Sequence, residues 1–241
     1  MTSKLTSLLF ETTSCYESNL QTLLVLLQGC EKGSLAVAGE VCLTGYDYAN
    51  MQKMLDFEPK AREEIAKASV GKTVVLTMLA RDGKDVKNFA YVFHDGELLR
   101  KQAKAKLFKL GDEHKYIAPG EEEDIVIFEA GGVKLGVLIC FELRFKKLWM
   151  QLEGADVIAV PSWWGKERKS HYITLTNALA VMNECYVLCS DNLHVDCHGE
   201  SGIITPFGEE RRNKGRPIAS LPFDKNEIKK MRRYMDIGIE A

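Results

Sequence analysis

The sequence has no long hydrophobic run, no surplus of charge of one sign and no low-complexity segment. The longest apolar run near the N-terminus, residues 23–27, is far shorter than the roughly 20 residues that span a bilayer, and no basic segment of a signal peptide precedes it. The 32 Lys and Arg nearly balance the 34 Asp and Glu, which leaves no basic field for nucleic acid or an anionic membrane. We therefore expect an unprocessed, cytoplasmic protein that binds neither.

Proline is scarce, and the cysteines do not suggest a disulfide framework. Only 6 of the 241 residues are proline, and the 7 cysteines are odd in number and dispersed. A composition of 46% hydrophobic and 27% charged residues is typical of a folded globular chain. A chain of this length does not need disulfides, so reduced thiols and a cytoplasmic location are expected. No linker or repeat divides the sequence, which predicts one domain over residues 1–241.

Apolar runs alternate with segments of helical periodicity along most of the chain. Strands are predicted at residues 5–10, 34–43, 72–80, 156–161, 185–190 and 218–223. Helices are predicted at residues 16–27, 58–67, 145–152, 169–183 and 225–234. Hairpins are predicted for residues 87–93 with 97–103, for 124–129 with 133–140, and around 206–208. This order favours an α/β protein with a mixed sheet covered by helices.

Cys140 stands at the end of an almost unbroken apolar strand, where a helix is predicted to begin. The unpaired N–H groups and the dipole of a helix N-terminus would lower the pKa of the thiol. The N–H of Phe141 could also hold an oxyanion that develops on a bound carbonyl. The alternative is that Cys140 is a small buried hydrophobic residue, as free cysteines often are.

A reactive thiol needs a base, and none of the 5 histidines stands in a context that pairs it with Cys140. Two glutamates at strand ends or in loops, Glu40 and Glu113, are the other candidates. Glu40 interrupts an apolar run, and a buried carboxylate must be paired or have its pKa raised. Such a carboxylate can take a thiol proton near neutral pH. The alternative for Glu40 is an outward-facing strand position.

Taken together, these segments resemble the nitrilase superfamily of carbon–nitrogen hydrolases, whose members carry a Glu-Lys-Cys triad in that chain order. The resemblance rests on residues 40–46, on Lys104 with the downstream Glu113 and Pro-Gly of residues 119–120, and on residues 136–145. Later segments that follow the family pattern are residues 154–162, 183–187 and 199–208. The sequence departs from the pattern at Gly39, where a proline is usual, and at residues 146–147 and 179–183.

The resemblance implies a four-layer α-β-β-α sandwich that is at least a homodimer or a higher homo-oligomer, with no metal or other cofactor. It also implies that Glu40 takes the proton of Cys140 and that Lys104 and the Phe141 N–H hold a tetrahedral oxyanion. Glu113 would position the lysine or the leaving group. The implied reaction is hydrolysis of a small carboxamide or N-carbamoyl compound through a cysteine thioester, with release of ammonia or an amine.

Four lysines crowd the middle block, and periodicity alone does not choose among them. They are Lys101, Lys104, Lys106 and Lys109. Register against Leu107, Glu113 and Pro119 favours Lys104, and a solvated hairpin edge is expected for at least two of the four lysines.

Other polar and aromatic residues allow two interpretations each. Trp163 and Trp164 follow a predicted strand, so they could line a substrate pocket or pack in the core. Glu142 fits a helix-cap partner better than a catalytic carboxylate. The spacing of Cys and His over residues 189–198 is unlike a metal framework, and no phosphate-binding loop is present.

Three other functions fit the sequence less well. A catalytically silent subunit that binds or assembles would require that the departures distort the triad. A nitrile hydrolase uses the same site, and amide hydrolysis is favoured only by analogy with the commoner branches. A redox-sensing thiol lacks a resolving cysteine near Cys140 in the sequence.

Overall fold

The computed structural model describes residues 1–240, which form two six-stranded sheets and the helices around them. The strands are β1 (Lys4–Leu8), β2 (Ser34–Val37), β3 (Thr73–Asp82), β4 (Asp85–His94), β5 (Glu97–Ala103), β6 (Phe128–Ala130), β7 (Val133–Val137), β8 (Val157–Pro161), β9 (Tyr186–Ser190), β10 (Gly202–Ile204), β11 (Glu210–Arg212) and β12 (Ile218–Pro222). The helices are α1 (Tyr16–Gln28), α2 (Met51–Ala68), α3 (Glu113–Tyr116), α4 (Lys146–Gln151), α5 (Lys169–Met182) and α6 (Lys225–Met235).

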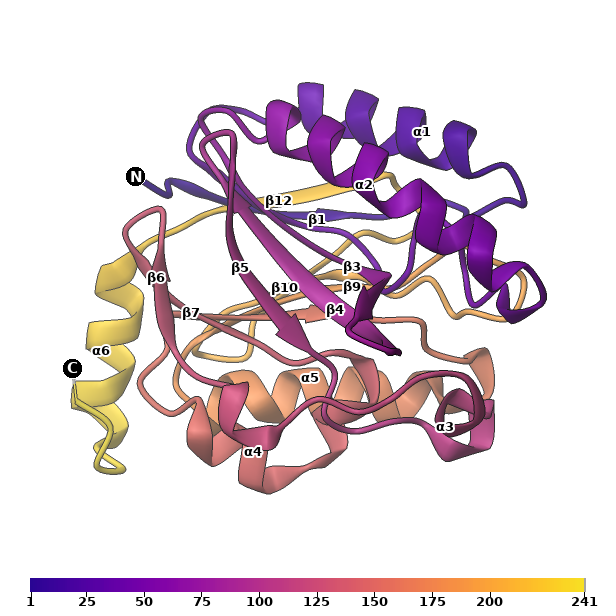
Figure 1. Ribbon diagram of the computed structural model, residues 1–241. Coiled ribbons are helices and arrows are strands. Elements are labelled where there is room, and N and C mark those ends of the chain that lie inside the picture. The colour runs from indigo at the N-terminus through magenta and orange to yellow at the C-terminus, as the bar shows by residue number, and fades with distance from the viewer. Residues whose placement is uncertain (241) are drawn as a thin grey trace.

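The two sheets pack face to face and are covered by helices on their outer sides (Figure 1). The first sheet has the order β12-β1-β2-β3-β4-β5 and is covered by α1 and α2, whereas the second has the order β11-β10-β9-β8-β7-β6 and is covered by α4 and α5. The molecule therefore has the expected α-β-β-α architecture. No helix among residues 1–240 is long and apolar enough to cross a membrane.

Both sheets are built on the same plan. In the first, β1, β2 and β3 are parallel, and the crossovers between them contain α1 and α2. In the second, β7, β8 and β9 are parallel, with α4 and α5 in the crossovers. Parallel neighbours require such crossovers, whereas short turns join the antiparallel pairs β3–β4, β4–β5, β6–β7 and β10–β11. The carboxyl ends of each parallel group therefore lie at one edge of its sheet.

Apolar side chains fill the space between the sheets and the space beneath each helical layer. The core between the sheets includes Val37, Val75 and Leu135, all fully buried. Under the first helical layer, Leu20 and Leu23 of α1 pack in a second core. The helical spacing of these leucines is what places them on one buried face of the helix.

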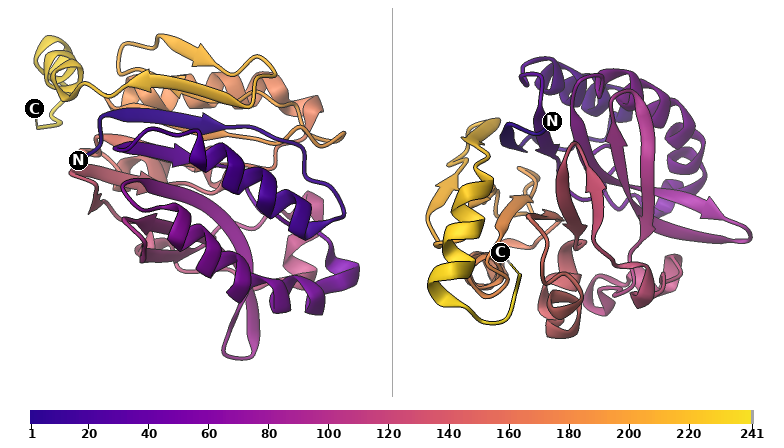
Figure 2. Two further views of the ribbon diagram at one scale, coloured as in Figure 1. Left: turned by 90° about the horizontal axis from the view of Figure 1, so that it is seen from above. Right: turned by 90° about the vertical axis from the view of Figure 1, so that its left-hand side faces the viewer.

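The last strand belongs to the first sheet, although the strands before it belong to the second. β12 pairs antiparallel with β1, with Lys4 opposite Pro222 and Leu8 opposite Ile218. Figure 2 shows this strand beside the indigo N-terminal strand, with α6 at one end of the sandwich.

Several element boundaries differ from those predicted, among them those of β2, β7 and α2. β2 ends at Val37 rather than at residue 43, because the chain turns there and Val41 adopts a φ of 40°. β7 ends at Val137, and Cys140 opens a short 3₁₀ helix, η4 (Cys140–Arg144), before α4. α2 begins at Met51 rather than at residue 58 and contains Pro59, because buried side chains such as Met54 extend its packed face towards the N-terminus.

Candidate active site

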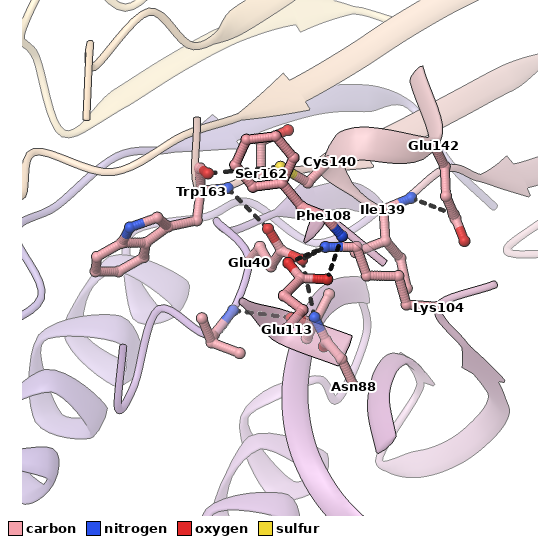
Figure 3. A network of polar contacts seen from close by, with 12 residues as sticks. Glu40, Asn88, Lys104, Phe108, Glu113, Ile139, Cys140, Glu142, Ser162 and Trp163 are labelled. Carbon is pink, nitrogen blue, oxygen red and sulfur yellow. Dashed lines mark hydrogen bonds and ion pairs between the residues drawn. The ribbon is translucent and has the colours of Figure 1, made fainter. Parts of the chain in front are cut away.

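The predicted catalytic side chains come from separate strand ends and meet at one place between the sheets (Figure 3). Glu40 follows β2, Lys104 directly follows β5, Cys140 follows β7 and Trp163 follows β8. Glu113 opens α3 in the loop after Lys104. Ligands of α/β proteins bind beyond the carboxyl ends of parallel strands, because the loops there converge.

Lys104 lies between two carboxylates, out of contact with solvent. Its Nζ donates to Glu40 Oε1 at 2.7 Å and to Glu113 Oε1 at 2.6 Å. Lys104 and Glu40 are fully buried and Glu113 is 3% exposed. Burial alone would lower the pKa of Lys104, but the two carboxylates hold that pKa above its usual value, so the side chain is an ammonium. Burial raises the pKa of Glu113, although Lys104 acts in the opposite direction.

The structure places Lys104, and none of the three neighbouring lysines, in this cluster. Lys101 is exposed with its ammonium over the Phe89 ring, and Lys109 is also exposed. Lys106 pairs with Glu122. The position predicted from the register of the middle block is therefore the one that faces Glu40.

Two polar residues of the cluster were missed in the sequence. Tyr46 Oη lies 2.7 Å from Glu40 Oε1 and 2.9 Å from Glu113 Oε1, so it links the two carboxylates. Asn88 Nδ2 donates to Glu40 Oε1 at 2.8 Å. Asn88 is a polar residue that precedes the apolar run of a predicted hairpin strand, and this position could have drawn attention to it. Tyr46 is the last residue of segment 40–46, which carries part of the family resemblance.

Cys140 sits in a strained turn next to the backbone of Trp163. Its φ is 47°, in the left-handed region that residues with a Cβ rarely adopt. Its Sγ donates to the carbonyl of Trp163 at 3.5 Å, while the N–H of Trp163 donates to Glu40 Oε2 at 3.1 Å. One residue therefore connects the thiol with the candidate base. The N–H of Phe141 lies in the first turn of η4, where N–H groups have no partner within the helix.

The expected lowering of the thiol pKa at a helix N-terminus is wrong. Burial, followed by the negative charge of Glu40, raises the pKa of Cys140 well above its usual value, and the charge of Lys104 offsets this only in part. The helix that begins at Cys140 is a 3₁₀ helix of only 5 residues, so its dipole is small. Cys140 therefore rests as a neutral thiol.

Glu142 does not join the cluster and instead connects two loops of the site. Its Oε2 accepts the N–H of Ile139 at 2.7 Å, and its Oε1 accepts the N–H of Ala105 at 2.6 Å. It thus binds the chain next to Cys140 and the chain next to Lys104. Burial raises the pKa of Glu142 to about 7. The interpretation of Glu142 as a cap partner fits these contacts.

The loop after β8 is held close to Glu40 by a glycine and by a buried aspartate. A Cβ on Gly39 would lie only 2.8 Å from the carbonyl oxygen of Asp191. Glycine, where the family usually has proline, therefore allows the loop after β2 to approach the loop after β9 closely. Asp191, which directly follows β9, accepts the N–H of Trp164 at 2.8 Å. Asp191 was missed because its function depends on a neighbouring strand that is distant in sequence.

Cys140 opens into a narrow hollow with a cavity volume of about 20 Å³. Its lining residues are Phe108, Cys140, Phe141, Arg144, Trp163, Trp164, Gly165 and Arg168. All three residues predicted to bind substrate, Phe141, Trp163 and Trp164, therefore lie in its wall. Trp164 is only 4% exposed and packs against Tyr172, so it both lines the hollow and belongs to the core.

The cysteines and histidines near the end of the chain do not form a metal site in the part that the structure describes. Within residues 1–240, no three His, Cys, Asp or Glu side chains lie where they could hold a metal ion. Cys189 Sγ donates to the carbonyl of Gly202, and burial lowers the pKa of His198 to about 3, which keeps the imidazole neutral.

Comparison with known proteins identifies the family and agrees with this fold. The pattern of the Carbon-nitrogen hydrolase family matches residues 12–210. A 2-oxoglutaramate amidase of Bacillus subtilis is 30% identical over 215 residues, which cover 83% of this chain and 82% of the relative. A 2-oxoglutaramate amidase of Paenarthrobacter nicotinovorans is 28% identical over 245 residues, which cover 91% and 83%.

Among solved structures, Saccharomyces cerevisiae Nit3, a member of branch 10 of the nitrilase superfamily, shares the fold. It has a TM-score of 0.86 and 22% identity, covering 98% of this chain and 96% of its own. The match to the family pattern over residues 12–210 and a relative 30% identical over more than four-fifths of both chains lead to one conclusion: the chain belongs to the carbon–nitrogen hydrolases.

Proposed function

We propose that this enzyme hydrolyses the C–N bond of a small carboxamide with Cys140 as nucleophile, Glu40 as base and Lys104 as oxyanion partner. The observation that carries the proposal is that two buried carboxylates and one buried ammonium lie together beside the thiol of Cys140. Glu40 and Glu113 bring two negative charges against the single positive charge of Lys104, with Cys140 beside them. In that surrounding the thiol keeps its proton until substrate arrives, so the site suits transfer of the proton to Glu40 during attack.

In the first half of the proposed reaction, Sγ forms a bond to the carbonyl carbon while its proton passes to Glu40. The carbonyl oxygen becomes an oxyanion, which Lys104 Nζ and the Phe141 N–H stabilise. Lys104 is suited to this role because its pKa is held high and its charge is therefore present at neutral pH. The C–N bond then breaks as Glu40 returns the proton to the nitrogen, and ammonia or an amine leaves a thioester on Cys140.

In the second half, Glu40 takes a proton from water, and the resulting hydroxide attacks the thioester carbon. Collapse of the second oxyanion breaks the C–S bond, the proton returns to sulfur, and a carboxylic acid leaves. Glu113 holds Lys104 in place throughout, through its 2.6 Å contact. Nitrile hydrolysis has no specific support in the site.

The proposed substrate is small and carries a carboxamide at the end of its chain. The hollow at Cys140 is narrow: its cavity volume of about 20 Å³ is far below the roughly 300–1,000 Å³ of pockets for drug-sized ligands. Both curated relatives described above are named 2-oxoglutaramate amidases, which favours a short amide.

The test measures ammonia released by the wild-type protein and by Cys140→Ala from ω-amides, aliphatic amides, N-carbamoyl amino acids and nitriles. The expected result is release from an amide by the wild type alone. Cys197→Ala is the matched control, because it removes another buried thiol that makes no predicted contribution to catalysis. Release from nitriles only, or equal release by Cys140→Ala, would overturn the proposal. If the wild type releases ammonia from none of these compounds, the alternative of a subunit that binds without catalysis is favoured.

We further propose that residues 1–241 act as one catalytic domain, in the cytoplasm, as a homodimer or higher homo-oligomer. All 7 cysteines are free thiols in the structure, which fits a reducing compartment. The support for self-association is a set of exposed apolar side chains on the second helical layer, Met150, Val181 and Met182.

A further inference from the structure

Two arginines line the hollow above Cys140, and the catalytic cluster uses neither of them. Arg144 ends η4, and Arg168 ends the short 3₁₀ helix η5 (Lys166–Arg168). The Arg144 guanidinium lies 4.9 Å from the centre of the Trp164 ring. The Arg168 guanidinium lies 5.3 Å from the centre of the Phe108 ring. Both side chains therefore rest with one face against an aromatic wall of the same hollow.

Neither guanidinium has a carboxylate partner in the described chain. No ion pair of residues 1–240 includes Arg144 or Arg168. Burial and then the charge of Arg168 lower the pKa of Arg144, as expected when two cations lie near one another without an anion between them. Like charges held together in a partly desolvated wall cost free energy, and a bound anion would offset that cost.

Both arginines are held in position by contacts that leave donors unused. The indole N–H of Trp164 donates to the backbone carbonyl of Arg168 at 2.9 Å. Arg144 Nη2 contacts His171 Nδ1 at 3.1 Å, and because a guanidinium only donates, this nitrogen of His171 is the acceptor. A guanidinium has five N–H donors in a rigid fork, so most donors of each arginine remain available to a ligand.

We propose that Arg144 and Arg168 bind a carboxylate of the substrate, so that the enzyme selects ω-amides with a carboxamide at one end and a carboxylate at the other. This inference rests on the proposed function, since it places the carboxamide at Cys140. The carbons between the two ends lie along Phe108, Phe141 and Trp163, and the size of the hollow limits them to a short chain. The two arginines act as specificity residues and take no part in bond breaking.

The test compares each anionic amide with a neutral amide of the same chain length. Glutaramate is compared with valeramide, and succinamate with butyramide. We expect the wild type to have a kcat/KM about 10- to 100-fold higher for the anionic member, which is the range for charge-assisted hydrogen bonds to a carboxylate. In Arg168→Gln and Arg144→Gln this preference should fall towards one, mainly through a higher KM for the anionic amide. Arg168→Lys should restore part of it.

Arg233→Gln is the matched control, because this arginine is exposed on α6 away from the hollow. Equal kcat/KM for the anionic and neutral amides in the wild type, or an unchanged preference in both arginine variants, would overturn the inference and leave the proposed function intact.

Binding of the dicarboxylate glutarate gives a readout that does not depend on turnover. We expect Cys140→Ala to bind glutarate in a calorimeter, and we expect addition of Arg168→Gln to weaken that binding about 10-fold or more. If the wild type hydrolyses no amide but glutarate still requires Arg168, the proposed function fails and the anion site stands. If glutarate binds equally well with and without Arg168, the anion site is refuted.

Discussion

The two oxygens of Glu40 have different surroundings. Oε1 accepts from Lys104, Tyr46 and Asn88, whereas Oε2 accepts only the N–H of Trp163. Oε1 is therefore saturated, and Oε2 is the oxygen with room for a proton from sulfur. The same residue that donates to Oε2 accepts the thiol proton of Cys140 at its carbonyl. The backbone of Trp163 therefore contacts both the thiol that gives up a proton and the carboxylate oxygen that would accept it.

Glu40→Gln should reduce turnover while making Cys140 more acidic. Loss of a general base is expected to lower kcat by about 10²- to 10⁴-fold. Because the charge of Glu40 is, after burial, the main cause that raises the pKa of Cys140, its removal should lower that pKa. The measurement is the rate of alkylation by iodoacetamide against pH, whose midpoint should move to lower pH in the variant.

The exposed Glu153 provides a control, since Glu153→Gln should leave both the turnover and the alkylation midpoint as in the wild type. An alkylation midpoint of wild-type Cys140 below that of an ordinary thiol would contradict the buried, neutral thiol described above. So would a midpoint that rises in Glu40→Gln.

Among single residues, those that follow apolar strands and match the family pattern could be predicted from the sequence. The polar residues that hold them in place through hydrogen bonds could not. Glu40, Lys104 and Cys140 each stand beside an apolar run or a turn motif, and the structure brings them together. Asn88 and Asp191 act through contacts with residues 48 and 27 positions away in the sequence. No local pattern encodes contacts of that kind.

At the scale of elements, the site depends on loops that hold one another. Glu142 is the connection between the loop after β7 and the loop after β5, through one backbone N–H on each side. A glutamine at this position has a single acceptor oxygen, so one of the two N–H groups would face an NH₂ donor. The position of Cys140 relative to Lys104 therefore depends on a carboxylate that touches neither side chain.

The titration of the Glu142 carboxyl group should be visible in the pH dependence of the free energy of unfolding. Its pKa is about 7 in the folded protein against an ordinary value of 4.5. A raised folded pKa means that the stabilisation is present below about pH 4.5 and is lost as the pH rises through about 7. At 1.36 kcal/mol per pH unit, this loss is about 3 kcal/mol.

Urea unfolding of the wild type and Glu142→Gln at pH 5, 6, 7 and 8 tests this. We expect the wild type to be the more stable protein at pH 5 and its advantage to shrink by about 2.5 kcal/mol towards pH 8, since part of the loss has already occurred at pH 5. Stability curves that run parallel from pH 5 to pH 8 would show that Glu142 does not titrate in this range.

The predicted elements were confirmed where hydrophobic periodicity decides the structure and were wrong where a turn or a neighbour decides it. α1 and α5 lie within a residue of their predicted limits. β2 stops early because a left-handed residue, Val41, turns the chain, and an apolar run does not reveal that turn. α2 starts early because Met54 packs beneath it, and such packing overrides the local signal of Pro59.

At the scale of the whole molecule, the second helical layer carries exposed apolar side chains close together. Met182 is 60% exposed and Val181 40% at the end of α5, and Met150 is 66% exposed on α4. Asn183 Nδ2 donates to the carbonyl of Trp149, so the end of α5 touches α4. Clustered exposed apolar residues are typical of interaction surfaces, which supports a dimer formed through these helices.

Light scattering coupled to size-exclusion chromatography tests this proposal. We expect the wild type to have at least the mass of a dimer and Met182→Glu to shift towards a monomer, because a charge buried in an apolar interface is unfavourable. Met235→Glu, on the exposed side of α6, is the control and should leave the mass unchanged. A wild-type monomer at micromolar concentration, or an intact dimer in Met182→Glu, would exclude this interface.

The class of the fold could be predicted from the alternation of strands and helices, and its four layers from the family resemblance. The membership of β12 could not be predicted, because nothing in residues 218–222 indicates a partner more than two hundred residues away. The hydroxyl of Ser7 also reaches the carbonyl of Cys189 in the opposite sheet at 2.8 Å. Contacts between distant segments of this kind depend on the assembled sandwich.

The pairing of β1 with β12 has a consequence for the order in which the protein is made. β1 is synthesised before every other strand described, but β12, its partner on one side, is synthesised only after both helical layers and the whole second sheet. Until then, β1 has one unpaired edge, which is a template for aggregation. The nascent chain therefore cannot complete its first sheet until residues 218–222 have been synthesised, so the sandwich closes only after its other strands are available.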